Sequence, residues 1–190
     1  MRYCILDTET TGFNPKKNKI IQITLKLSDS DKMLDLYLKH SNYEWNPYTL
    51  AFHKKVEPKI LEIIEKEGVD VSTLKKELGD FWKDTGILNT KELKDNVVFV
   101  AYNAKFDKGF TDNILGLSSK YLPSQVLDVL KMAKDNKELK LAKKKGTLKN
   151  FKLETVAEYL KVEVEGDNFH NSRYDVLVTE QVFLKLKGDD

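Results

Sequence analysis

Two apolar runs, each followed closely by a carboxylate, constrain this chain more than any other feature. Residues 97–101, Val-Val-Phe-Val-Ala, form an unbroken apolar run, and residues 2–6 form a short strand-like run that leads directly into Asp7. A continuous apolar run of this length is typical of an interior strand that is covered on both faces. Both runs therefore predict central strands, and the carboxylates beyond them are predicted to lie at strand ends, where α/β proteins place their ligand sites.

The order of the other elements predicts a mixed α/β sheet. Apolar alternation predicts strands at 20–27 and 33–38, and the turn residues between them make the pair a hairpin. A hairpin followed by alternating strands and helices is typical of this fold class. The other expected elements are a strand at 125–127 and helices at 58–66, 72–83, 105–115, 128–136, 153–160 and 174–186.

Length and composition predict one soluble domain. The 190 residues carry 32 basic and 30 acidic side chains, so the net charge of +2 does not by itself indicate a nucleic-acid binder. The single cysteine, Cys4, excludes an internal disulfide and fits a reducing compartment. No apolar segment is long enough to span a membrane, and no signal core precedes Asp7. We therefore expect a cytoplasmic protein with a single domain at 1–187 and a short tail at 188–190.

Asp7 and Glu9 form the first candidate for chemistry. On an extended chain, residues two apart point the same way, so these carboxylates would face one spot. Such a pair is costly unless a cation lies between them, and oxygen ligands favour Mg²⁺ or Mn²⁺. However, with 30 acids in 190 residues, roughly five such pairs arise by chance. A metal site and a solvated turn are equally compatible with this motif alone.

Two further segments carry candidate catalytic residues. Asp107 follows the apolar run at 97–101, and it could instead be a simple helix cap. His170 precedes the last predicted helix, where it is placed to act as a general base, and Asp175 lies in the first turn of that helix. In isolation, the sequence favours an ordinary surface residue at His170 and a partner of the helix dipole at Asp175.

Taken together, the three segments resemble the ribonuclease H-like exonucleases with a DEDD signature, in their histidine-containing branch. That family includes the proofreading subunit of bacterial replicative polymerase, ribonuclease T and oligoribonuclease. The matching residues are Asp7-Thr8-Glu9-Thr10-Thr11-Gly12, then Asn103-Ala104-Lys105-Phe106-Asp107, then His170 and Asp175 at the family's H-x₄-D spacing. The motifs occur in the family's order, and the resemblance covers nearly the whole chain.

The resemblance implies a ribonuclease H-like mixed five-stranded sheet flanked by helices, and a 3′–5′ exonuclease activity. Asp7, Glu9, Asp107 and Asp175 would hold two divalent ions, Mg²⁺ or Mn²⁺, while His170 takes a proton from the attacking water. The substrate would be the 3′ end of a nucleic acid, preferably single-stranded and with DNA slightly favoured, and the product a 5′-mononucleotide. An RNA-trimming or oligoribonuclease-like enzyme and a non-catalytic nucleic-acid-binding module are the alternatives. A polymerase partner and a homodimer both remain open.

The family pattern also implies residues that contact the terminal nucleotide. The substrate-binding candidates are Thr10, Thr11, Gly12, Phe13, Asn103 and Phe106. Aromatic rings stack on bases without regard to sequence, so Phe13 and Phe106 are stacking candidates, with core packing as the alternative for both. Near residue 53, where the family often has His-Gly-Ile-Thr, this chain instead has His53-Lys54-Lys55-Val56.

A lysine-rich segment at 134–152 is the last notable feature. It contains eight lysines opposed by two acids, which gives a local charge of +6. Such a run is either a mobile, solvated loop or an arm that contacts phosphates. Under the second interpretation, the phosphate contacts would be Lys143, Lys144 and Lys145.

Overall fold

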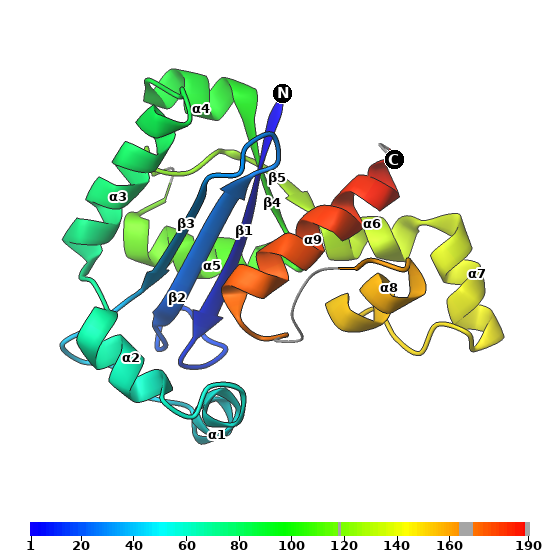
Figure 1. The fold of residues 1–190 in the computed structure, drawn as a ribbon, viewed down its shortest axis with the longest axis horizontal. Coiled ribbons are helices and arrows are strands. Elements are labelled where there is room, and N and C mark those ends of the chain that lie inside the picture. The colour runs from blue at the N-terminus through cyan, green and yellow to red at the C-terminus, as the bar shows by residue number, and fades with distance from the viewer. Residues whose placement is uncertain (118, 164–168, 189–190) are drawn as a thin grey trace.

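The computed structural model describes the whole chain except residues 118, 164–168 and 189–190, so the end of the predicted tail lies outside the described residues. Its core is a five-stranded mixed sheet in the order β3-β2-β1-β4-β5 (Figure 1). The central pair β1–β4 and the pair β4–β5 are parallel, whereas β1–β2 and β2–β3 are antiparallel. The predicted hairpin and fold class are confirmed. The strands are β1 (Arg2–Thr10), β2 (Ile20–Leu27), β3 (Met33–Tyr37), β4 (Val97–Ala101) and β5 (Gln125–Asp128).

Strand β1 is longer than the sequence indicated, and the two strands beside it explain why. Its pairing with β4 extends only from Arg2 to Ile5. Its antiparallel pairing with β2 continues to Thr10, with a register shift between Glu9 and Thr10. Asp7 and Glu9 therefore lie on the strand and not beyond its end. They are nevertheless past the end of β4, so one edge of β1 is unpaired there.

Helices cover both faces of the sheet and produce two main cores, beside a small third cluster of Ile21, Ile60 and Ile64. In Figure 1, α9 crosses in front of the strands and α5 lies behind them. Because neighbouring strand residues point to opposite faces, Leu6 packs into one core and Ile5 into the other. The first core lies under α3 (Val71–Asp84), α4 (Thr90–Asn96) and α5 (Ala104–Leu115). The second lies under α6 (Val129–Asp135), α7 (Lys137–Lys145), α8 (Leu153–Tyr159) and α9 (Ser172–Lys187).

Two helices between β3 and α3 close one end of the sheet. They are α1 (Pro47–Val56) and α2 (Ile60–Glu67). Helix α1 was not predicted, because it buries only Thr49 and His53 and has no apolar stripe. The side chain of Asn46 caps its N-terminus by accepting from the backbone N–H groups of Tyr48 and Thr49. Among the described residues, no helix is long and apolar enough to cross a membrane.

The lysine-rich segment is largely helical, which contradicts its interpretation as a mobile loop. Residues 137–145 form α7, whose Leu139 and Ala142 are buried in the second core. The helix begins at a side-chain cap from Asn136 and ends at Gly146, which adopts a left-handed conformation with φ 81°. The sequence pattern did not indicate this helix because only two of its residues are buried, too few to form a recognisable apolar stripe.

Candidate active site

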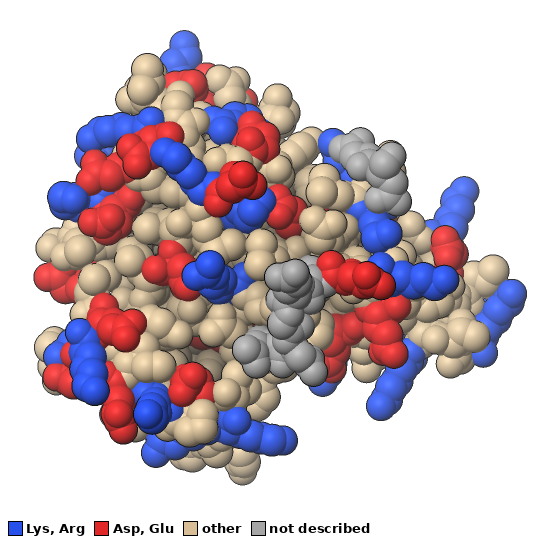
Figure 2. Space-filling model, viewed as in Figure 1, with Lys and Arg blue, Asp and Glu red and all other residues tan. Residues whose placement is uncertain are grey.

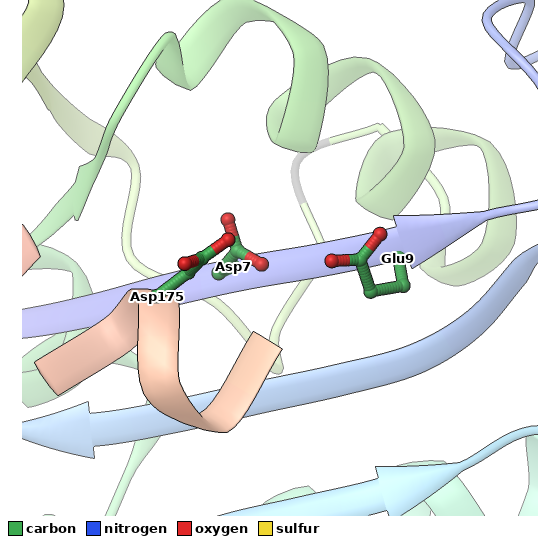
Figure 3. A group of neighbouring side chains, drawn as sticks. All are labelled: Asp7, Glu9 and Asp175. Carbon is green, nitrogen blue, oxygen red and sulfur yellow. The ribbon is translucent and has the colours of Figure 1, made fainter. Parts of the chain in front are cut away.

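Three carboxylates converge where β1 passes the end of β4. Asp7 and Glu9 extend from β1, and Asp175 extends from the first turn of α9 into the same space (Figure 3). One oxygen from each lies within 4.8 Å of the others. In the described part of the chain, no other three or more His, Cys, Asp or Glu side chains come close enough together to hold one ion. The sequence expectation that Asp7 and Glu9 face one spot is met in the structure.

Asp107 is held next to this group by the unpaired edge of β1. The backbone N–H of Thr8 donates to its Oδ1 at 3.0 Å, and the Thr8 hydroxyl donates to the same oxygen at 2.8 Å. Asp107 lies in the first turn of α5 and is 2% exposed. The cap position of α5 belongs to Asn103, so Asp107 is not the N-cap. Asp107 lies outside the three-carboxylate group, although its charge raises the pKa of Asp7.

His170 and Asp175 are linked through the entrance of α9. The backbone N–H of His170 donates to Asp175 Oδ2 at 3.1 Å, and His170 has a positive φ of 73°. Asn171 caps the helix by accepting from the N–H of Arg173. The serine at the next position, Ser172, is fully buried and hydrogen-bonds Thr24 of β2. These contacts fix the start of α9 against the sheet.

Burial raises the pKa values of all four carboxyl groups. Burial raises the pKa of Asp7 and of Glu9 well above their usual ranges, and neighbouring carboxylates raise both further. Burial raises the pKa of Asp107 to about 7 against the opposing effect of the Thr8 hydrogen bonds. It also raises the pKa of Asp175 to about 7 against the His170 N–H. A concentration of negative charge of this kind is relieved by a cation.

The geometry fits a divalent cation. Asp175 Oδ1 is buried and has no hydrogen-bond partner among the described residues. A buried carboxylate oxygen without a partner is unfavourable unless something else binds it. Together with oxygens of Asp7 and Glu9, it forms an all-oxygen donor set, which Mg²⁺ and Mn²⁺ prefer.

A cavity of about 390 Å³ opens beside the carboxylates. Thr10, Phe13 and Phe106 line it, as the sequence led us to expect, and so does His170. Phe13 is 72% exposed, so it is not a core residue, whereas Phe106 is half-buried and also packs against the first core. The remaining described lining residues are Thr8, Glu9, Tyr48, Thr49, Phe52 and His53.

The described residues that line this cavity do not include three of the substrate-binding candidates, namely Thr11, Gly12 and Asn103. Thr11 is fully buried. A Cβ at Gly12 would lie 2.6 Å from the Asn18 side chain, so the close approach at this glycine is made within the chain. Asn103 is exposed and adopts a left-handed conformation with φ 69°.

His53 is a site residue that the sequence interpretation missed. Its side chain is 5% exposed, and its Nε2 lies 3.1 Å from the Thr10 carbonyl and 3.7 Å from Glu9 Oε2. Because burial lowers the pKa of His53, its ring is neutral near pH 7, and the Glu9 contact is not an ion pair. The available signal was that His53 stands where the family's His-Gly-Ile-Thr segment has its histidine, although the residues after it differ.

Comparison with known proteins identifies the family. Residues 4–183 match the family RNase_T, described as exonuclease. The chain belongs to this exonuclease family. It is 29% identical to DNA polymerase III PolC-type of Clostridium perfringens (strain 13 / Type A) over 98% of the chain and 12% of that protein. It is 27% identical to the 3′–5′ exonuclease DinG of Bacillus subtilis (strain 168) over 97% of the chain and 17% of that protein.

Solved structures show the same fold. The RNase domain of yeast Pop2 matches with a TM-score of 0.70 at 19% identity, covering 98% of this chain and 76% of that one. A zinc-bound complex of E. coli ExoI with single-stranded DNA also has a TM-score of 0.70, at 17% identity, covering 100% and 41%. S. pombe Pop2p with Mg²⁺ and Mn²⁺ matches at 0.65 and 15% identity, covering 98% and 82%. Together with the family match and the curated relatives, this shared fold confirms the resemblance to ribonuclease H-like DEDD exonucleases of the histidine branch.

Proposed function

We propose that this chain is a metal-dependent 3′–5′ exonuclease that removes 5′-mononucleotides from nucleic-acid ends. The observation that carries the proposal is the convergence of three carboxylates within 4.8 Å beside a cavity lined by aromatic rings. The family match and the similarity to the DinG exonuclease support the same activity. The curated relatives are much longer than this chain, which spans 12% of PolC and 17% of DinG.

The residues divide the chemistry between them. Asp7, Glu9 and Asp175 would hold the first of two divalent ions, and Asp107 would act at the second. Two such ions, when bound, stabilise the charge that develops on the attacking and leaving oxygens. His170 would take the proton of the attacking water, and burial lowers its pKa, so the ring is neutral and able to accept a proton near pH 7.

The cavity favours an unpaired end as substrate. Phe13, Tyr48, Phe52 and Phe106 surround a space of about 390 Å³, and exposed aromatic rings in such a space stack on bases whatever their identity. A base that is still paired in a duplex cannot enter between them. ExoI, a structural neighbour, was solved with single-stranded DNA. We propose single-stranded ends as the preferred substrate, with DNA favoured over RNA.

A panel of 5′-labelled substrates tests the activity and its direction. Single-stranded DNA, duplex DNA, a mismatched primer and RNA are each incubated with Mg²⁺, with Mn²⁺ or with EDTA. We expect a ladder that shortens from the 3′ end, fastest on the single strand and absent in EDTA. Release of the label in the first turnover would instead indicate 5′–3′ polarity, and an intact substrate in all lanes would reject the proposal.

Asp7→Asn tests whether the carboxylate cluster carries the activity. The change keeps the size of the side chain and removes a charge that the metal requires, so we expect kcat/KM to fall by at least about 100-fold. Asp84→Asn is the matched control, because Asp84 is an exposed carboxylate 3.8 Å from Lys32 and remote from the cavity. Equal activities of the two variants would exclude the cluster as the catalytic site.

A further inference from the structure

Helix α1 contacts both sides of the candidate site through two adjacent side chains. His53 contacts the end of β1, and Phe52 contacts His170 at the entrance of α9. No other described helix has side chains in the cavity lining that contact both the end of β1 and His170. The chain therefore places a helix with few buried residues where it touches a metal-ligand candidate and the general-base candidate together.

The contact on the β1 side is directional. The carbonyl of Thr10 can only accept, so the His53 Nε2, 3.1 Å away, must carry a hydrogen and donate it. A second bond holds the opposite, N-terminal end of the helix to the next residue of the chain, since the N–H of Asn46 donates to the Thr11 carbonyl at 2.8 Å. With β1 fixed at residues 10 and 11, the His53 ring lies 3.7 Å from Glu9 Oε2 and limits where that carboxylate can turn.

The contact on the α9 side is a ring pair. The Phe52 and His170 rings meet edge to face, with centroids 4.6 Å apart and an interplanar angle of 81°. The hydrogen bond from His170 to Asp175 uses the backbone N–H, so it fixes the main chain and does not hold the imidazole ring. Phe52 therefore limits the orientation of the imidazole from the cavity side.

We propose that Phe52 and His53 are positioning residues: His53 orients Glu9 for the metal, and Phe52 orients the His170 ring for proton transfer. Neither side chain touches the reacting atoms in this role. The proposal rests on the proposed exonuclease function for Phe52. For His53 it concerns metal binding, which is measurable without any substrate.

The His53 half is tested by Mn²⁺ binding. Mn²⁺ affinity is measured by calorimetry without nucleic acid on the wild type, His53→Gln and His53→Leu. The glutamine amide places an N–H near the position of Nε2, whereas leucine has similar bulk and no donor. Loss of a partner that orients a ligand typically weakens metal binding 10- to 100-fold, so we expect a loss of about that size in His53→Leu and a loss under about threefold in His53→Gln.

Unchanged Mn²⁺ affinity in His53→Leu would overturn this half of the proposal, and so would an equal loss in both variants. Thermal unfolding in EDTA checks that each variant is folded. If His53→Leu does not fold, His53→Ala replaces it, because the smaller side chain admits water to the Thr10 carbonyl. Lys54→Ala is the matched control: Lys54 is exposed on the same helix and does not line the cavity.

The Phe52 half is tested by separating kcat from KM. Phe52→Ala should lower kcat about tenfold and leave Mn²⁺ affinity unchanged, and Phe52→Tyr, which keeps the ring, should recover most of kcat. A rise in KM alone would show that Phe52 contacts only substrate and would overturn its positioning role. An inactive wild type would reject the exonuclease function, and the Mn²⁺ comparison would still decide the role of His53.

Discussion

At the scale of single residues, the carboxyl groups of the site differ in how many hydrogen bonds they accept from the protein. Asp107 Oδ1 accepts two hydrogen bonds from Thr8. Asp175 accepts one at Oδ2 from His170, and its buried Oδ1 accepts none among the described residues. A carboxylate held by protein donors needs a cation less than one that is not. This difference supports the proposal that Asp175 contacts the metal directly and that Asp107 acts from farther away.

The raised pKa values predict how stability depends on pH without metal. The pKa values of Asp107 and Asp175 are about 7 in the folded chain, against about 4 in an unfolded one. Between these two pKa values, the folded chain binds more protons than the unfolded chain does. The free energy of unfolding therefore falls as the pH rises from about 4 through about 7. In EDTA, the free energy of unfolding from urea titrations should be lower at pH 8 than at pH 5.

The double variant Asp107→Asn with Asp175→Asn is the control for this prediction. It removes two of the four carboxyl groups whose pKa is raised, so its stability should change less between pH 5 and pH 8 than that of the wild type. A wild type that is equally stable or more stable at pH 8 would contradict the raised pKa values.

His170 gives a kinetic prediction at the same scale. Its ring lines the cavity, and burial lowers its pKa, so it is neutral near pH 7 and can accept a proton. General-base catalysis contributes about 10²- to 10⁴-fold, and His170→Ala should lose that much kcat in single-turnover assays. His40→Ala is the comparison, because His40 bonds the Ile20 carbonyl outside the cavity. A loss under about threefold in His170→Ala would exclude the ring as the base.

At the scale of elements, the site depends on where strands stop and helices start. Strand β4 stops pairing with β1 at Ile5, and this frees the Thr8 N–H for Asp107 of α5. Helix α9 is fixed to β2 through the hydrogen bond between Ser172 and Thr24. These elements come from distant parts of the sequence. The carboxylates converge only because the fold brings the ends of these elements together.

Helix α7 carries the element-scale prediction. Its lysines project at the right-hand edge of Figure 2, and acidic side chains lie beside them in the region of α8. The Lys143 ammonium donates to the Lys149 carbonyl, while Lys144 and Lys145 are exposed. If all three contact phosphates, changing them to Gln should reduce the slope of log affinity against log salt for a single strand by about 2.

The comparison is a double variant on α3, Lys75→Gln with Lys83→Gln, which removes lysines from a helix in the other core. Binding is measured by fluorescence anisotropy over a range of salt concentrations. If the triple variant has an unchanged slope, the α7 lysines do not contact phosphates and are only solvated surface residues.

At the scale of the whole molecule, a metal ion bound by the three carboxylates would couple the two halves of the fold. Asp7 and Glu9 belong to the sheet, whereas Asp175 belongs to the helical layer of the second core. A cation between them stabilises the folded chain by about 2.7 kcal/mol at 100 times its Kd, which raises the Tm of a chain of this size by about 5–10 °C. Calorimetric scans with Mn²⁺ or EDTA at pH 8 measure this shift.

The shift should be smaller at pH 5, because protons then compete with the cation for the carboxylates. Asp7→Asn should abolish most of it at both pH values. A metal shift of the same size in Asp7→Asn would place the bound ion elsewhere on the molecule.

The sequence by itself determined the sheet, the family and the carboxylates that the structure brings together. Apolar runs such as 97–101 report burial directly, and the spacing of His170 and Asp175 is local, so both can be read along the chain. Tertiary structure decided that Asp7 and Glu9 lie within β1, that α7 is a helix, and that His53 contacts Thr10. Each of these depends on a partner distant in sequence, and no local pattern encodes such a contact.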